Sequence, residues 1–337
     1  MIKVISFGEL LVDMLSSRVS DDQDGKGTES ETERFTKYPG GAPANVAAAI
    51  GKLGGHSYFA GKVGADMFGD FLVQSLEAMQ VCTDYLLQTS EAKTALAFVS
   101  LDKEGERSFE FYRGPSADLL FGPGDFKPEW FENRGIFHFC SNTLTEPGIL
   151  EATQAGLDAA RAAGWLVSFD MNLRHNLWPE GADPFESVWA CVKQADLVKL
   201  SAEELAFLCR HTDEATVLKQ ILSAGASLIL ITDGGKPLRY YTAHQTGSIQ
   251  PPNVQMIDST AAGDAFVGGL LYRLSELDMS VADLEGVGTD QQRLESILTF
   301  ASACGAHAVT HAGAFTSLPS RDEVAAFMAC QEDAQIT

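Results

Sequence analysis

Leu197–Ser201 (LVKLS), Ala202–Cys209 (AEELAFLC) and Leu228–Gly234 (LILITDG) follow one another along the chain as strand, helix and strand. The two apolar runs have the length of strands buried on both faces, and the segment after the first suits a helix. Other segments fit the same pattern, namely the apolar runs Ile2–Gly8, Ser57–Gly64, Gly135–Ser141 and Leu166–Asn172 and the helical segments Pro147–Ala163, Leu270–Leu277 and Gln291–Ala308. This alternation predicts a doubly wound α/β fold around a mostly parallel sheet.

A second, smaller sheet is indicated where this alternation is interrupted. Thr94–Leu101 and Arg107–Arg113 are rich in β-forming residues and flank a polar turn at Asp102–Gly105, which predicts a β-hairpin. Two further strands of this accessory sheet are expected in Leu10–Ser16 and in the run that ends at Tyr38.

The polar and mostly acidic stretch Arg18–Arg34 predicts a mobile loop between those two strands. We therefore expect one domain over residues 1–337, with a lid formed by about residues 10–38 and 94–113.

The composition indicates a folded, acidic protein. Of its 337 residues, 45% are hydrophobic and 21% are charged, and the net charge is −22. Such a charge repels nucleic acid and anionic membrane surfaces, so we expect neither as a partner. It does not exclude ATP, because a nucleotide site needs only local donors. The apolar run Met1–Gly8 is too short for a signal peptide or a membrane span, so we expect a cytoplasmic protein. The six scattered cysteines form no C-x-x-C pair, which predicts reduced thiols.

Two familiar nucleotide-binding motifs are missing from the sequence. No G-x-x-x-x-G-K-[ST] sequence occurs, which argues against a P-loop enzyme. Gly122-Pro123-Gly124 begins a G-x-G but has no third glycine and no preceding strand, so an NAD-dependent oxidoreductase is only a distant alternative.

The segment Asp258–Leu270 (DSTAAGDAFVGGL) carries the strongest indication of chemistry. Small residues lead directly into an apolar helix, which leaves the first-turn N–H groups accessible to an anion. Such donors can hold a phosphoryl group while the carboxylate of Asp264 accepts a proton from an attacking hydroxyl. On spacing alone, a close-packed helix start with Asp264 as an ordinary first-turn carboxylate is the alternative.

A second motif is Tyr38–Asn45 (YPGGAPAN), which precedes the helical segment Val46–Leu53. The diglycine lets backbone approach a ligand closely, and Pro43 suits a first helical turn, which places the amide of Asn45 where it can bind hydroxyls. The alternative is a simple tight turn before a helix. Spacing along the chain cannot show whether this motif lies near Asp264.

Together these motifs resemble the two signatures of the PfkB, or ribokinase-like, carbohydrate kinases. The signature segments are Gly40–Asn45 with Gly61–Asp66, and Asp258–Asp264. The similarity extends over essentially the whole chain, and within the family it is greatest to fructokinases at Thr94–Val99, Phe111–Asp118, Asp170–Arg174 and Leu177–Pro179. The resemblance implies a ribokinase-like three-layer fold with a small β-sheet lid, and ATP-dependent phosphorylation of the 6-hydroxyl of D-fructose.

The resemblance also implies roles for individual residues. Asp264 is the general base, the backbone of Ala261, Ala262 and Gly263 forms the anion hole, and Arg174 reaches both acceptor and transferring phosphate. The implied sugar-binding residues are Asp13, Gly40, Gly41, Asn45, Phe98, Phe111, Arg113, Asn172, Arg174 and Asp264, with Phe98 and Phe111 covering the ring. The implied nucleotide-binding residues are Lys199, Ser201, Glu204, Thr232, Gly234, Ala262, Gly263, Ser302 and Ala303, the last two beside the adenine.

Two ions are implied in the same way. Glu204 organises Mg²⁺ with ATP, through water. A monovalent cation, expected to be activating K⁺, is held largely through carbonyls by Asp258, Thr260, Ala308, His311, Gly313 and Ser317. His307 and His311 stand four residues apart and formally allow a two-histidine metal site, but no third ligand is evident. ATP and a small sugar are the expected partners, and lids of this type often pair the chain into a homodimer.

One departure from the family pattern bears on activity. The usual Gly-Ala-Gly-Asp is Ala261-Ala262-Gly263-Asp264 here, which adds a Cβ where the backbone has to accommodate phosphate or an unusual φ. The remaining alternatives are a kinase of the same fold that acts on ribose, 2-keto-3-deoxygluconate or a nucleoside such as an aminoimidazole riboside, and a non-catalytic sugar or nucleotide sensor.

Overall fold

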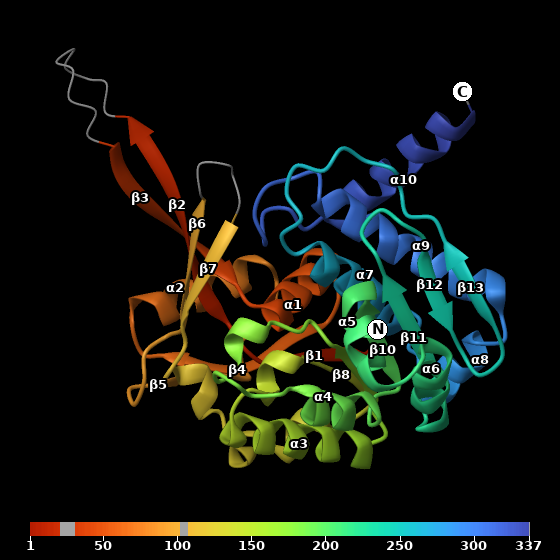
Figure 1. Ribbon diagram of the computed structural model, residues 1–337, viewed down its shortest axis with the longest axis horizontal. Helices are drawn as coiled ribbons and strands as arrows, with labels where there is room; N and C mark the ends of the chain where they lie inside the picture. Colours follow the sequence, from red (N-terminus) through yellow and green to blue (C-terminus); the bar gives the residue numbers. More distant parts are fainter. Residues whose placement is uncertain (21–30, 102–106, 337) are drawn as a thin grey trace.

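The computed structural model describes residues 1–20, 31–101 and 107–336, which build two separate sheets (Figure 1). The larger sheet has nine strands, in the order β13 (Thr246–Ile249), β12 (Leu238–Tyr241), β11 (Leu228–Thr232), β10 (Leu197–Ser201), β9 (Leu166–Asp170), β8 (Gly135–Cys140), β1 (Lys3–Phe7), β4 (Ser57–Gly64) and β5 (Leu86–Thr89). Every neighbouring pair from β11 to β5 is parallel, and β12 and β13 extend the sheet with antiparallel pairings. The predicted doubly wound, mostly parallel sheet is therefore confirmed.

Each central strand buries both faces, which is why it reads as a continuous apolar run. In β1, Val4 faces one layer of helices and Ile5 faces the other. The layer on the Ile5 side contains α3 (Pro147–Ala162), α4 (Phe185–Val192), α5 (Ala202–Leu208) and α6 (Glu214–Ser223). The layer on the Val4 side contains α1 (Ala42–Lys52), α7 (Ala262–Glu276), α8 (Val281–Val287) and α9 (Gln291–Ala308).

The remaining helices lie at the margins of these layers. They are α2 (Met67–Ala78), α10 (Arg321–Ile336) and the short 3-10 turns η1 (Ala117–Leu120), η2 (Pro123–Asp125), η3 (Pro128–Phe131), η4 (Ser141–Leu144), η5 (His175–Leu177) and η6 (Cys209–His211). Figure 1 shows α10 beside α9, with the C-terminus pointing away from the body. No helix in the described ranges is long and apolar enough to cross a membrane. All six cysteines are free thiols.

The smaller sheet has four strands in the order β3 (Glu31–Gly40), β2 (Leu11–Ser20), β6 (Leu96–Leu101) and β7 (Arg107–Tyr112). The predicted hairpin is confirmed by the antiparallel pairing of β6 with β7, and its turn at Asp102–Gly105 lies outside the described residues. Figure 1 shows this sheet at one end of the molecule, with β2 and β3 reaching away from the main body.

The expected loop at Arg18–Arg34 is wrong at both of its ends. The ladder between β2 and β3 continues to the pair Ser20 and Glu31, so both ends of the predicted loop are strand, and residues 21–30 lie outside the described residues. Charged and polar residues are compatible with a ladder of this kind, because backbone groups make its hydrogen bonds and a small sheet has solvent on its surface.

Candidate active site

The start of α7 presents an accessible first helical turn. Ala261 has φ 58 and ψ 11, a left-handed conformation, and the helix begins at the next residue. No side chain of a described residue caps this turn, and Ala262 and Gly263 line a cavity. The left-handed backbone at Ala261 is the unusual φ anticipated for that position, and it costs about 1–2 kcal/mol for a residue with a Cβ.

Asp264 follows Gly263 in the first turn of α7, and its side chain is buried against two asparagines. The Nδ2 group of Asn45 donates to its Oδ2 atom at 2.8 Å, and the Nδ2 group of Asn172 donates to its Oδ1 atom at 3.2 Å. Asn45 comes from α1, directly after the diglycine, and Asn172 follows the end of β9. The structure therefore brings the two sequence motifs together around one carboxylate.

The environment of Asp264 suits a proton acceptor. Burial raises its pKa to about 7, and the charge of Asp170 also raises the pKa. The hydrogen bond from Asn45 and the charges of Arg174 and Lys199 lower the pKa, without reversing the effect of burial. A base whose pKa lies near neutral pH combines a useful ionised fraction with appreciable proton affinity.

Lys199 and Asp170 form a buried ion pair beside the start of α7. The Nζ atom of Lys199 lies 3.0 Å from Oδ1 of Asp170, and both side chains are less than one-tenth exposed. A Cβ atom placed on Gly263 would lie 3.3 Å from the same Nζ atom. Burial lowers the pKa of Lys199, but the carboxylates of Asp170 and Glu204 raise the pKa by more than burial lowers it. The net shift is upward, so the ammonium stays charged.

Glu204 joins the start of α5 to the segment that carries Asn172. Its Oε2 atom accepts from the N–H of Ser201 at 2.7 Å, and the Ser201 hydroxyl caps the N–H of Glu204 at 3.1 Å. Its Oε1 atom accepts from the N–H of Leu173 at 2.8 Å. This contact fixes the turn after β9, where Asn172 has φ 38 and Arg174 is exposed.

The diglycine turn is shaped by the absence of two side chains. A Cβ on Gly40 would lie 2.2 Å from Oδ2 of Asp13, and a Cβ on Gly41, whose φ is 108, would lie 2.4 Å from the carbonyl oxygen of Glu9. Burial and the charge of Glu9 raise the pKa of Asp13 to about 6. The turn therefore holds Asp13 and Asn45 at the same end of the site.

Arg113 is committed to internal contacts. Its Nε atom donates to Asp118 at 2.6 Å, one terminal nitrogen donates to the carbonyl oxygen of Asn142 at 2.9 Å, and the other contacts the Thr145 hydroxyl at 3.4 Å. A buried guanidinium requires these partners, and the polar contact of Arg113 with the sugar stays a prediction.

Phe98 and Phe111 lie on opposite faces of the small sheet. Asp13 is paired with Ala97, and Ala97 is paired with Phe111, so these three residues share one face. Phe98 follows Ala97 and therefore points to the other face, where its ring contacts Phe35 at 5.3 Å and Tyr112 at 5.2 Å between centroids. Phe111 therefore shares the face of Asp13 and Phe98 does not, and their covering of the sugar ring stays a prediction.

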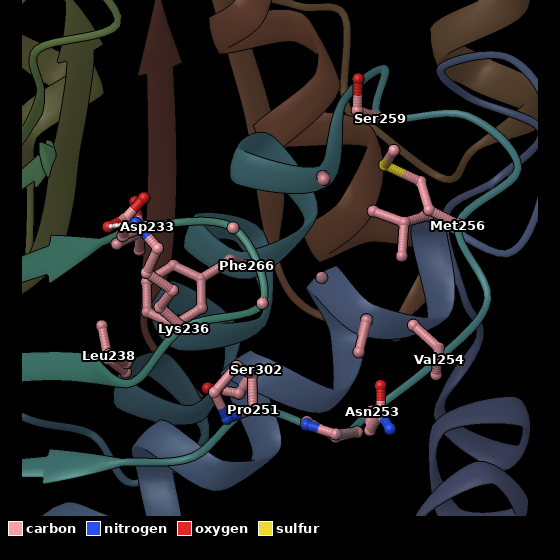
Figure 2. Close-up of a pocket in the computed structure, with 18 of the residues that line it drawn as sticks. Asp233, Lys236, Leu238, Pro251, Asn253, Val254, Met256, Ser259, Phe266 and Ser302 are labelled. Carbon is pink, nitrogen blue, oxygen red and sulfur yellow. Dashed lines mark hydrogen bonds and ion pairs between the residues drawn. The ribbon is translucent and has the colours of Figure 1, made fainter. Parts of the chain in front are cut away.

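A cavity of about 400 Å³ opens beside the start of α7 (Figure 2). Figure 2 shows Asp233 and Lys236 on one side of it, and Val254 and Met256 on the opposite side. The expected nucleotide residues that line it are Thr232, Gly234, Ala262, Gly263 and Ser302. Ala303 does not line the cavity: it packs against Leu53 and Tyr272 in a separate apolar cluster. Gly305 and Ala306 line the cavity instead, because they share with Ser302 one face of α9.

The residues expected around a monovalent cation lie in two adjoining loops. Asp258 accepts from the N–H of Thr260 at 2.9 Å through Oδ1 and from the N–H of Gly313 at 3.0 Å through Oδ2. The N–H of His311 donates to the carbonyl oxygen of Ala308, and the Ser317 hydroxyl donates to the carbonyl oxygen of Ala314. His311 is exposed, and its ring stacks on that of His307 with centroids 4.5 Å apart. Among the described residues, no three His, Cys, Asp or Glu side chains are grouped to hold a metal ion.

Some residues of this region were missed by sequence reasoning. Glu9 and Asn142 bind one another, and Asp170 holds Lys199. Glu9 and Asp170 each lie at the carboxyl end of a predicted strand, where functional groups of parallel sheets gather, so their position was a usable signal. Asn142 directly follows the predicted strand Gly135–Ser141, so the same signal applied to it.

Known proteins resemble this chain along nearly its whole length. The sequence family described as pfkB family carbohydrate kinase matches residues 1–321. Fructokinase-2 of Zea mays is 41% identical over 319 residues, which cover 94% of this chain and 91% of that protein. The crystal structure of fructokinase with bound ATP from Xylella fastidiosa has a TM-score of 0.91 and 44% identity, and the match covers 98% of this chain and 99% of the other. A fructokinase double mutant from Vibrio cholerae O395, in a form with fructose, ADP and potassium ion bound, has a TM-score of 0.82 and 36% identity over 97% of this chain and 98% of the other.

Proposed function

Because the chain belongs to the pfkB family of carbohydrate kinases, we propose that it transfers the γ-phosphoryl group of ATP to the 6-hydroxyl of D-fructose. The observation that carries this proposal is the position of Asp264. Its carboxylate is the meeting point of the diglycine helix, through Asn45, and of the helix start that opens on the cavity. An acceptor hydroxyl and a phosphate can therefore approach the same group from two sides.

In the proposed mechanism, Asp264 removes the proton of the attacking hydroxyl as the oxygen bonds to phosphorus. Asn45 and Asn172 orient the carboxylate. When the sugar binds, its hydroxyl donates to the carboxylate of Asp264 in place of one of the two asparagine amides. The N–H groups of the first turn of α7 and the ammonium of Lys199 stabilise the charge that develops on the transferred group. Arg174, which is exposed beside the site, adds a second cation.

The nucleotide is proposed to occupy the cavity, with Thr232 and Gly234 on one side and Ser302 on α9 near the base. Each carboxylate oxygen of Glu204 accepts one backbone N–H and keeps a lone pair for water. That arrangement suits Mg²⁺, which keeps several of its own waters. Bound with ATP, Mg²⁺ neutralises charge on the phosphates, and Glu204 is the residue that would hold its waters.

A potassium ion is proposed for the loops that Asp258 ties together. Asp258, Thr260 and Gly313 are joined by hydrogen bonds, and Ala308, His311 and Ser317 belong to the adjoining loop. A cation there would order the connection into Ala261 without taking part in the chemistry. The fructokinase from Vibrio cholerae supports this proposal, since that protein was observed with potassium ion bound.

The small sheet is proposed to act as a lid of a single domain spanning residues 1–337, with lid segments at about 10–38 and 94–113. Closure would exclude water, which would otherwise compete as an acceptor.

Phe35 and Tyr112 are exposed on either side of Phe98, and this aromatic patch supports homodimer formation through the lid. Loss of self-association in Phe35→Ser and Tyr112→Ser, measured by sedimentation, would support it. The free thiols support the cytoplasm as the compartment.

The function is tested by ADP release, coupled to a spectroscopic assay, across fructose, ribose, 2-keto-3-deoxygluconate and aminoimidazole riboside, with and without potassium. We expect the highest kcat/KM with fructose and a lower rate without potassium. A higher kcat/KM with another acceptor would replace fructose, and no acceptor-dependent ADP release would favour a non-catalytic sensor. Asp264→Asn is the control, and it is expected to bind both ligands while retaining less than about a tenth of the turnover.

A further inference from the structure

Glu9 is a buried carboxylate that the mechanism above does not use. It follows β1 after Gly8, and its side chain is only 2% exposed. Its Oε1 atom accepts two hydrogen bonds, from the N–H of Ala42 at 3.0 Å and from the Nδ2 group of Asn142 at 2.9 Å. A buried charge of this kind is costly unless its contacts serve the structure or the site.

Both parts of Glu9 act on the diglycine turn. Its carbonyl oxygen occupies the space that a side chain on Gly41 would need, at 2.4 Å from that Cβ position. Its carboxylate holds the N–H of Ala42, the first residue of α1, and Asn45 lies in the same first turn. Glu9 therefore holds the first turn of α1 through these two contacts, and the direction of the Asn45 amide toward Asp264 depends on that turn.

The same carboxylate connects to the loop after β7. Asn142 donates to Glu9 and, through its carbonyl oxygen, accepts from Arg113 at 2.9 Å. Arg113 in turn pairs with Asp118. Glu9 thus contacts the first turn of α1 directly and the loop of Arg113 through one residue.

We propose that Glu9 is a positioning residue of the acceptor site, which fixes the diglycine turn through Oε1 and places its negative charge beside Asp13. This inference rests on the proposed function, because it takes Asp13 to bind the acceptor. Both carboxylates lie at the turn: Oδ2 of Asp13 occupies the space beside Gly40, and Oε1 of Glu9 accepts from the N–H of Ala42. An ionised Asp13 accepts hydrogen bonds from sugar hydroxyls, whereas a protonated one loses part of that capacity.

Within the described part of the chain, one charged group shifts the pKa of Asp13. Glu9 is the group whose charge, after burial, raises the pKa of Asp13 to about 6. Burial raises the pKa of Glu9 itself, whereas the charge of Arg113 and the hydrogen bonds from Asn142 and Ala42 lower it and favour the ionised form. Asp118 pairs with Arg113. The partners of Asp13 in the neighbouring strands are Tyr38 and Ala97. Removing the charge of Glu9 should therefore lower the pKa of Asp13, and acceptor binding should persist to lower pH.

The test compares wild type with Glu9→Gln, using the sugar that the ADP-release panel identifies as the acceptor. Glutamine keeps one acceptor oxygen, so it retains both hydrogen bonds while losing the charge. The dissociation constant is measured by calorimetry from pH 5 to pH 8. For a pKa of about 6, wild-type binding should weaken about fourfold between pH 8 and pH 5.5. In Glu9→Gln that weakening should move at least about half a pH unit lower.

Two further variants make the result decisive. Glu151→Gln, on the exposed side of α3, is the matched control and should follow wild type. In Glu9→Ala the hydrogen bonds are lost, and binding at pH 8 should weaken about tenfold or more. An unshifted pH dependence in a folded Glu9→Gln would overturn the charge effect, and wild-type binding by Glu9→Ala at pH 8 would overturn the positioning role. An error in the identity of the acceptor would appear in the ADP-release panel, and the Glu9 comparison would then use the sugar that works.

Discussion

The side-chain amide of Asn45 donates a 2.8 Å hydrogen bond to Oδ2 of Asp264, although the two residues are 219 positions apart in the sequence. This contact joins the first turn of α1 to the first turn of α7, and both helix starts follow a segment of small residues. It also stabilises the ionised form of a carboxylate that burial would otherwise keep protonated.

Loss of this contact should raise the pH at which the enzyme becomes active. Without the donor of Asn45, the pKa of Asp264 should rise above about 7, so the acid limb of the pH profile of kcat/KM should move to higher pH in Asn45→Ala. Asn172→Ala removes a longer bond, 3.2 Å, and should shift the limb less. The profiles are recorded by ADP release from pH 5.5 to pH 9. Equal shifts in the two variants would contradict the dominant role of Asn45.

The raised pKa of Asp264 also predicts how Asp264→Asn changes stability with pH. A carboxyl group whose pKa is about 7 in the folded state and about 4 in the unfolded chain favours folding while it is protonated. That contribution is complete below pH 4 and is lost as the pH rises through 7. The advantage of Asp264→Asn over wild type should therefore grow between pH 4 and pH 7, to at most about 4 kcal/mol, and then level off.

Thermal melting at pH 4.5, 6 and 8 measures this difference, with the exposed Asp158→Asn on α3 as the control. The Tm of Asp264→Asn should exceed that of wild type by several degrees at pH 8 and by much less at pH 4.5. A Tm difference that is constant across this range would show that burial of Asp264 does not perturb its ionisation.

The pair formed by Lys199 and Asp170 predicts opposite shifts from two substitutions. Lys199 lowers the pKa of Asp264 and Asp170 raises it. The acid limb of kcat/KM should therefore move up in Lys199→Met and down in Asp170→Asn, and kcat should fall in both because the ammonium is lost or misplaced. Shifts of the same sign would indicate that both variants act by distorting the site. Because each single change leaves a buried partner unpaired, both should also lower Tm.

Central strands were predictable from the sequence because they are buried on both faces, so each reads as an apolar run bounded by polar residues. The strands β12 and β13 were not predicted. In β12 buried and partly exposed residues alternate over only four positions, which is too short a pattern to distinguish from a loop. The open start of α7 was predictable from the small residues before Asp264, whereas the role of Asp264 as the base stays a prediction.

The contacts that complete the site were not predictable, because they depend on helical phase and on distant partners. Ser302 lines the cavity and Ala303 does not, yet both lie in a run of small residues on α9 that gives no apolar stripe from which to assign a face. The faces of the small sheet on which Phe98 and Phe111 lie could not be assigned, because the pairing of β6 with β7 was unknown. Glu9 finds its partner Asn142 across 133 positions, a distance at which spacing carries no information.

Ala261 offers a substitution that should stabilise the protein. Its φ of 58 places a Cβ in the left-handed region, at a cost of about 1–2 kcal/mol, whereas glycine adopts this conformation freely. Part of that gain is offset by the greater freedom of glycine in the unfolded chain, about 0.5–1 kcal/mol. Ala261→Gly should therefore raise Tm, by at most about 2 °C. The neighbouring Ala262→Gly is the matched control, because Ala262 is the first residue of α7 and glycine there should lower Tm. A lower Tm in Ala261→Gly would mean that the methyl group, which packs against the apolar cluster around α1, contributes more than its backbone strain removes.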